Sequence, residues 1–137
     1  MELTVETLAD WRDIPELRHE AGRAVYTTSF EMNEAHLEEN LRLILDLGRV
    51  HEVAEGRING RAAGVLLMPP YRTDIADFVE PGRNVIEVAL TPVLHNRLVG
   101  YGETGDPRWG QFQNRNGLAP TGLIGPARLL PHWRERI

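Results

Sequence analysis

Residues that could contact a ligand gather between positions 95 and 111 of the chain. Tyr101 and Trp109 offer flat aromatic faces, while Asn96 and Arg97 offer planar groups that donate hydrogen bonds. Trp109 lies in a Gly- and Pro-rich stretch outside any alternating apolar pattern, and functional residues concentrate on such loops. These four residues are therefore candidate ligand contacts.

Tyr71 and Arg72, directly after Pro69-Pro70, form a second candidate pair with one aromatic face and one guanidinium. Each polar candidate also has a structural interpretation, because polar side chains in loops most often bond backbone. Tyr71 and Arg72 can brace a strand end, and Asn96 can satisfy the backbone of a loop. The candidate ligand-binding residues are thus Tyr71, Arg72, Asn96, Arg97, Tyr101 and Trp109.

The residue types that bind metals form no recognisable pattern in this sequence. The five histidines are scattered without the close spacing of a zinc site, and the chain has no cysteine. No loop resembles a dedicated set of oxygen ligands, although a structural calcium is common in sandwich modules. We therefore predict no cofactor and leave a structural calcium open.

The formal charge of −5 over 137 residues argues against a nucleic-acid partner, because phosphate binding needs a basic surface. The longest apolar run, from Ala62 to Met68, is too short to cross a bilayer. The first residues lack the basic start and apolar segment of a secretory signal. These features predict no membrane partner, and they fit either a cytoplasmic protein or a domain of a longer exported one.

The stretch from Gly82 to Thr91 carries the clearest strand pattern. Ile86, Val88 and Leu90 alternate with more polar neighbours such as Glu87, and a two-residue period buries one face of a strand. We expect this stretch to be a central strand of an antiparallel β-sandwich, with the three aliphatic side chains in the core.

Alternating residues and bounding turns predict further strands, at residues 3–8, 23–32, 41–47, 50–58, 61–68, 71–78 and 127–130. Asn59-Gly60 between two of them is a strong hairpin signal, because both central residues of a type I′ turn need positive φ. Gly56 in the first arm of that hairpin predicts a bulge or a thin spot. Asn33 is expected to cap a short helical turn that runs to Asn40.

Roughly eight short strands without a long helix predict an all-β fold. The expected architecture is a jelly-roll β-sandwich of two antiparallel sheets, formed by one domain over residues 1–137. Residues 9–22 are expected to be irregular, with Trp11 as their anchor in the core. The glycine-rich region after Thr91 is expected to be a long loop that holds the candidate ligand residues.

Several blocks of the sequence occur in an order that resembles a known module. They are Trp11, Gly22–Tyr26, Leu45–Val50, Asn59–Arg61, Pro70–Ile75, Pro81–Asn84, Asn96–Leu98 and Gly122–Pro126. This order resembles the galactose-binding-like jelly-roll domain of glycoside hydrolases. The likeness is to the C-terminal domain of the family 106 α-L-rhamnosidases and, behind that, to the sugar-binding domain of the family 2 β-glycosidases.

The resemblance covers the chain from about Leu8 to Leu130 and implies a setting in polysaccharide degradation. It does not imply catalysis by this chain, because in these enzymes the catalytic carboxylates lie in a separate barrel domain. The leading hypothesis is a carbohydrate-binding or ancillary module that binds a plant-polysaccharide sugar without turnover. Its predicted partners are a carbohydrate and a glycoside hydrolase catalytic domain.

Two alternative functions stay open at this point. The first is a purely structural domain that packs on a catalytic barrel, which Val85 and Ala89 on the outward face of the central strand would favour. The second is a small stand-alone glycoside hydrolase, which requires two carboxyl groups about 5 to 10 Å apart. No spacing singles out such a pair among the available acids, Asp74, Asp77, Glu87, Glu103 and Asp106.

Overall fold

Strand β7 (Gly82–Thr91) is the inner strand of a four-stranded antiparallel sheet with the order β1-β7-β4-β5. Its neighbours are β1 (Ala24–Met32) and β4 (Val53–Ile58), and β5 (Arg61–Leu66) forms the other edge. Ile86, Val88 and Leu90 are buried as predicted, because the alternation of β7 turns this face toward the core. The computed structural model describes residues 2–34, 41–112 and 117–133.

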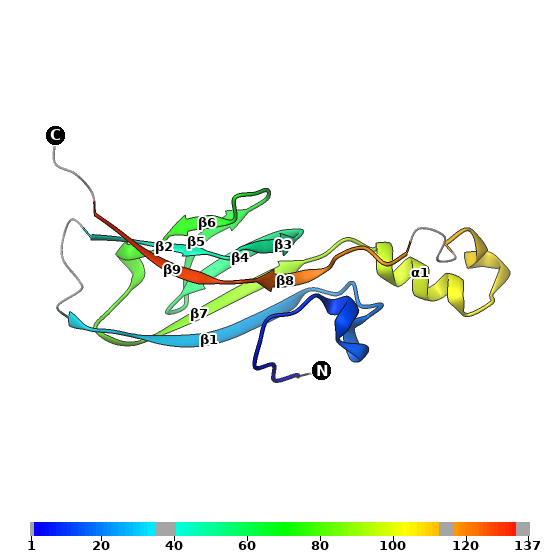
Figure 1. Ribbon diagram of the computed structural model, residues 1–137, viewed down its shortest axis with the longest axis horizontal. Coiled ribbons are helices and arrows are strands. Elements are labelled where there is room, and N and C mark those ends of the chain that lie inside the picture. The colour runs from blue at the N-terminus through cyan, green and yellow to red at the C-terminus, as the bar shows by residue number, and fades with distance from the viewer. Residues whose placement is uncertain (1, 35–40, 113–116, 134–137) are drawn as a thin grey trace.

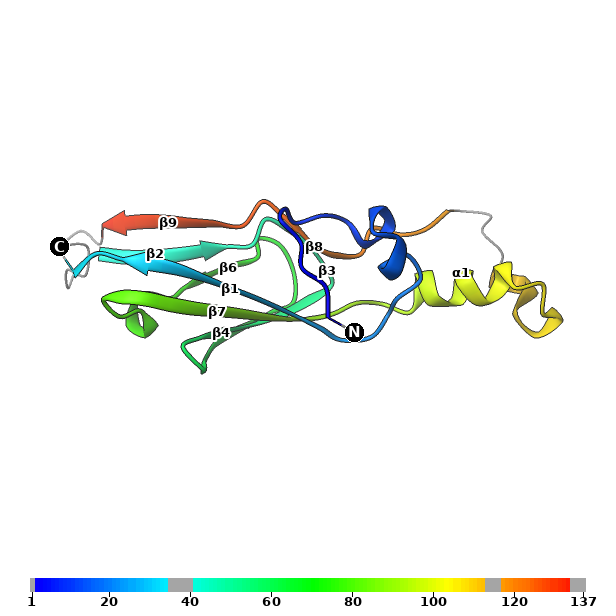
Figure 2. The same ribbon diagram turned by 90° about the horizontal axis from the view of Figure 1, so that it is seen from below.

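A second layer faces this sheet (Figures 1 and 2) and consists of β6 (Arg72–Asp74), β2 (Leu41–Asp46) and β9 (Arg128–Trp133). Beside it, β3 (Arg49–His51) pairs with β8 (Gly122–Gly125) in a two-stranded sheet. All pairings in the described part of the chain are antiparallel. The predicted all-β sandwich is therefore confirmed.

The core lies between the two layers and is closed at one end by Trp11. The Trp11 indole is 1% exposed, and its Nε1 donates a hydrogen bond to the Tyr26 hydroxyl at 2.6 Å. Its backbone N–H bonds the carbonyl of Thr121 at 2.9 Å, which ties the N-terminal segment to the start of β8. The space beyond the indole is filled by Leu43 and Leu45 of β2 and by Ala54 and Ile58 of β4. The prediction that Trp11 anchors this segment is confirmed.

The β4–β5 hairpin turns at Asn59-Gly60 as predicted, with φ of 52° and 80°. The Asn59 side chain ties this turn to β7 of the same sheet, because its Nδ2 donates to Asn84 Oδ1 at 2.9 Å. Asn84 is fully buried and also bonds the backbone of Glu80 and Gly82. The bulge predicted near Gly56 is present as a shift of register between Gly56 and Arg57.

Some predictions about local structure were wrong, and one strand was missed. Residues 3–8 form no strand, and Leu3 and Val5 are exposed, because no neighbouring strand pairs with them in the described residues. The stretch after Thr91 is not a continuous loop, since it contains helix α1 (His95–Glu103) and the 3-10 helix η5 (Pro107–Phe112). Strand β8 was not predicted at all. The capped turn expected at residues 33–40 falls mostly outside the described residues.

The other helical elements are single 3-10 turns in the connections. They are η1 (Trp11–Asp13), η2 (Pro15–Leu17) and η4 (Ala76–Phe78), and η4 occupies the end of a segment that was expected to be extended. Within the described ranges, no helix has the length and apolar character needed to span a bilayer.

Candidate ligand-binding site

Helix α1 and η5 form an arm, residues 95–112, that extends past the end of both sheets (Figures 1 and 2). Tyr101 and Trp109 lie against each other on this arm, with ring centroids 5.1 Å apart and planes tilted by 44°. Tyr101 is 41% exposed and Trp109 is partly exposed. The arm therefore presents a small aromatic surface to solvent, made of two of the predicted residues.

Asn96 fixes the base of the arm rather than facing solvent. Its side chain is 1% exposed and its Nδ2 donates to Ala119 O and to Thr121 Oγ1, both at 2.8 Å. Its Oδ1 accepts the Ala119 N–H at 2.7 Å. All of these bonds join α1 to the segment that directly precedes β8. The geometry therefore supports the structural interpretation of Asn96, in which its side chain satisfies the backbone of a loop.

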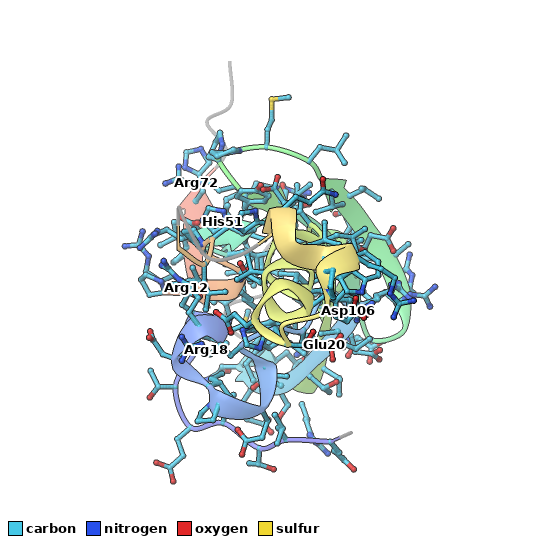
Figure 3. The ribbon with its side chains drawn as sticks, turned by 90° about the vertical axis from the view of Figure 1, so that its right-hand side faces the viewer. Arg12, Arg18, Glu20, His51, Arg72 and Asp106 are labelled. Carbon is cyan, nitrogen blue, oxygen red and sulfur yellow. The ribbon has the colours of Figure 1, made fainter. Side chains whose placement is uncertain are left out.

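Arg97 provides a second attachment, through its ion pair with Glu20 of the N-terminal segment. The N–H groups of Gly22 and Ala21 also bond the Glu20 carboxylate and, together with Arg97, lower its pKa. One guanidinium nitrogen of Arg97 is thus engaged, and the side chain remains about one third exposed. Figure 3 looks onto the arm and shows Glu20 beside it.

Gly100 lets α1 approach the N-terminal segment closely. A Cβ at this position would lie 2.8 Å from Cγ of His19, so any larger residue would push the two apart. His19 Nε2 also lies 3.3 Å from Glu103 Oε2, although without hydrogen-bond geometry. The contacts of Asn96, Arg97 and Gly100 together hold the arm in one orientation.

Tyr71 and Arg72 lie on the second sheet, apart from the arm along the long axis (Figures 1 and 2). Tyr71 is 5% exposed, its hydroxyl donates to the carbonyl of Glu52 at 2.7 Å, and burial raises its pKa. Arg72 is half exposed and its Nε donates to Asp46 Oδ2 at 3.1 Å. The structure therefore brings Tyr101 and Trp109 together on the arm, with Asn96 buried at its base, and places Tyr71 and Arg72 elsewhere.

Sequence reasoning did not single out Arg128, which lies in the same row of side chains as Arg72 and Asp46. The sequence around Arg128 gives little indication of this position. Arg128 lies opposite Asp46 only in one register of β9 against β2, and that register depends on where β9 starts. Asp46 was not predicted for a similar reason. It follows a leucine-rich run, and its burial depends on residues of the two neighbouring strands.

The acidic residues with perturbed pKa are held in the charged form. Hydrogen bonds from the Ala76 N–H and from Arg42 outweigh the effect of burial on Asp74, so its pKa lies below the usual value. Asp77 shares the same guanidinium at 3.2 Å. The amide of Gly48 and two arginines likewise lower the pKa of Asp46. A general acid needs the opposite, a raised pKa.

Among the described residues, no group of three or more His, Asp and Glu side chains is placed to hold a metal ion. The ion pair of Asp106 with Arg108 on the arm, at 2.7 Å, is exposed on the arginine side and lowers the pKa of Asp106. Asp106 and Arg108 are thus engaged with each other.

The outward face of the larger sheet carries exposed aliphatic side chains. Val25, Ala89, Glu55 and Val65 lie directly opposite one another across the four strands. Val25 is 56% exposed and Val65 58%, and Leu67 beyond β5 is 64% exposed. An open depression of about 200 Å³ on this face is lined by Arg23, Val25, Glu55, Arg57, Glu87 and Ala89.

No family model matches the chain. A curated protein of Formosa agariphila named "Putative beta-glucuronidase" is 28% identical over an alignment of 142 positions, which covers 82% of this chain and 12% of that protein. A rhamnosidase from Novosphingobium sp. PP1Y is 32% identical, with a TM-score of 0.77 over 86% of this chain and 12% of its own. A β-glucuronidase from Bifidobacterium dentium is 26% identical, with a TM-score of 0.51 over 58% of this chain and 13% of its own.

The chain thus spans only 12% or 13% of these relatives. A β-D-mannosidase from Dictyoglomus thermophilum, at 16% identity and a TM-score of 0.60, shares the fold. The likeness to a β-sandwich domain of glycoside hydrolases, inferred above from ordered sequence blocks, is confirmed.

Proposed function

We propose that this chain is a non-catalytic accessory domain of a glycoside hydrolase and that its arm binds a sugar of a plant polysaccharide. The accessory role is supported by the extent of the similarity, which covers 86% of this chain but only 12% of the rhamnosidase. A fragment of that size accounts for one β-sandwich and leaves the rest of the enzyme to other domains.

The aromatic pair of the arm supports the second part. Sugar rings have apolar faces that pack on aromatic side chains, and Tyr101 and Trp109 provide two such faces 5.1 Å apart. The buried bonds of Asn96 hold the pair in place before a ligand arrives, which reduces the entropy lost on binding. Arg97, with one nitrogen bound to Glu20, retains donors for sugar hydroxyl groups.

The charge state of the carboxyl groups supports binding without turnover. Glycoside hydrolysis uses one carboxyl group that keeps its proton near neutral pH. Asp10, Glu20, Asp46, Asp74 and Asp106 all have a lowered pKa. These five groups are therefore ionised and engaged with arginines or backbone amides at neutral pH.

The test is calorimetric titration of the chain with rhamnose and galactose, alongside an assay on nitrophenyl glycosides. We expect binding with a Kd on the order of millimolar and no turnover. Trp109→Ala and Tyr101→Ala remove aromatic contact and should each weaken binding about fivefold. Leu67→Ala, which removes an exposed apolar side chain far from the arm, serves as the control. No heat from either sugar, or unchanged binding by Trp109→Ala, would contradict the proposal.

A second candidate function is docking on the catalytic domain of the same enzyme, which the exposed Val25 and Val65 on the two edge strands of the larger sheet favour. Both valine side chains are more than half exposed. Aliphatic side chains exposed in this way are typical of a surface that another domain covers. Without that domain, the isolated chain should self-associate through this face. Sedimentation should show concentration-dependent dimers that the Val25→Ser/Val65→Ser variant abolishes and Val93→Ser on the arm side does not. A monomer at every concentration would contradict this docking role.

A further inference from the structure

A row of three charged side chains crosses the second sheet on its outer face. Asp46 of β2 lies directly opposite Arg72 of β6 on one side and Arg128 of β9 on the other. Arg72 Nε is 3.1 Å from Asp46 Oδ2, and Arg128 Nη2 is 3.5 Å from the same oxygen. The Asp46 side chain is 7% exposed, whereas the two arginine side chains are 52% and 58% exposed.

The carboxylate of Asp46 is satisfied without using most of the guanidinium donors. Oδ1 accepts the Gly48 N–H at 2.9 Å and Oδ2 accepts Arg72 Nε. The contact with Arg128 is at the limit of a hydrogen bond, so it adds little. In the described part of the chain, Nη1 and Nη2 of Arg72 and Nε and Nη1 of Arg128 donate to no protein atom.

The row therefore carries a local excess of positive charge on a chain whose formal charge is −5. Two guanidinium groups share one carboxylate, which leaves one net positive charge at the surface. The neighbouring Arg42 is bound to Asp74 and Asp77, so that group carries one net negative charge, and the positive excess is confined to the row of Arg72, Asp46 and Arg128. Figure 3 shows Arg72 on the flank of the molecule away from Asp106 and Glu20 of the arm region.

Paired guanidinium groups with free, outward donors are suited to a planar anion, because each fork can bind both oxygens of a carboxylate. A structural role alone does not require the pair, since Arg72 by itself would balance Asp46. Both arginines are anchored on strands of one sheet, which fixes the distance between the forks.

We propose that Arg72 and Arg128 form a carboxylate subsite through which the domain binds the uronate residues of an acidic oligosaccharide. This proposal rests on the sugar-binding function proposed above and names its ligand class. The subsite is separate from the aromatic pair of the arm, so the two can be tested independently. Arg128 is the more informative residue, because its removal leaves the hydrogen bonds of Asp46 with Gly48 and Arg72 in place.

The test compares galacturonate with galactose, which differ at a single carbon, by titration at low and moderate salt. Galacturonate should bind at least about tenfold more tightly at low salt, and this advantage should shrink as salt rises. Arg128→Gln and Arg72→Gln should each reduce galacturonate binding about fivefold and leave galactose binding unchanged. Arg57→Gln, on the outer face of the other sheet, is the matched control, and circular dichroism checks that each variant is folded.

The outcomes separate the two proposals. Equal binding of galacturonate and galactose, or galacturonate binding unaffected by both arginine variants, overturns the carboxylate subsite. Equally tight binding of galactose 6-sulfate overturns its assignment to a planar carboxylate. If galacturonate binding is lost in Arg128→Gln but neither sugar responds to Trp109→Ala, the subsite stands and the sugar site on the arm fails.

Discussion

At the scale of single residues, Asp46 links the stability of the sheet to pH. Its side chain accepts the Gly48 N–H and two arginines while nearly buried, and these bonds lower its pKa. A group whose folded pKa is lowered stabilises the protein above its unfolded pKa of about 3.9 and loses that effect as the pH falls further. Asp10 and Asp74, with lowered pKa of their own, act in the same direction.

We therefore expect the free energy of unfolding to be nearly constant from about pH 7 to 5 and to fall below about pH 4. Asp46→Asn should cost about 1–3 kcal/mol at neutral pH, because it weakens bonds to charged partners in a buried position. The cost should shrink at low pH, where Asp46 itself is protonated. Urea unfolding as a function of pH measures both effects.

Asp13→Asn, at an exposed position, is the control for this series and should leave the free energy of unfolding nearly unchanged. An Asp46→Asn curve that runs parallel to that of the wild type down to low pH would contradict the assignment, because the variant would then have lost no pH-dependent stability.

The sequence indicated the types of residues at the site but not the direction of their side chains. Asn96 and Trp109 both appeared as loop residues, yet Asn96 is buried by bonds to Ala119 and Thr121, which lie more than 20 positions away. Tyr71 offers an aromatic ring that the fold places in the core. Such outcomes depend on contacts between distant segments, which a local pattern cannot contain.

At the scale of elements, the start of β8 is packed directly on the Trp11 indole. Gly122 has a φ of 104°, and an added Cβ would overlap the indole ring. Gly82, at the start of β7, has a φ of 87° but open space around the same position. Both glycines therefore adopt a positive φ that disfavours other residues, but only Gly122 also lacks room for a side chain.

We expect Gly82→Ala to reduce the free energy of unfolding by about 1 kcal/mol, the cost of a left-handed conformation for alanine. Gly122→Ala should cost about 2–5 kcal/mol, because displacement of the buried indole adds to that strain. Chemical denaturation followed by tryptophan fluorescence measures the difference. Equal effects of the two substitutions would mean that the indole does not hold β8 in place.

The strands with regular alternation could be predicted from the sequence, whereas α1 could not. Gly82–Thr91 agrees with the prediction because every second residue from Asn84 to Leu90 is buried, and Ala24–Met32 agrees because most of its alternate residues are partly buried. Helix α1 contains Gly100 and Gly102, which disfavour a helix intrinsically. Its Gly100 packs closely on His19, and tertiary contacts of this kind can outweigh a poor local propensity.

At the scale of the whole molecule, the β-sandwich positions two surfaces of different chemistry. The arm lies at one end of the long axis (Figures 1 and 2) and presents Tyr101 and Trp109. The second sheet presents Arg72 and Arg128 on its outer face. The outer face of the larger sheet exposes Val25 and Val65 beside charged side chains such as Arg57 and Glu87.

The resemblance of ordered sequence blocks predicted this architecture more reliably than any single motif. Trp11, Asn59-Gly60 and Gly122–Pro126 each hold a specific structural role: a core anchor, a hairpin turn and a strand packed on the anchor. Their order along the chain is therefore fixed by the fold. The sugar and its site are not fixed in this way, because the proposed ligand contacts lie on the arm and on two half-exposed arginines, Arg72 and Arg128.

The central claim is that the arm binds a sugar, and an NMR titration of the ¹⁵N-labelled chain with rhamnose tests it most directly. The indole N–H signal of Trp109 and the amide signals of residues 95–111 should shift with increasing sugar. The indole signal of Trp11, buried and bonded to Tyr26, should stay in place and serves as an internal control. A spectrum unchanged at saturating sugar, or shifts confined to the sheets, would contradict the account.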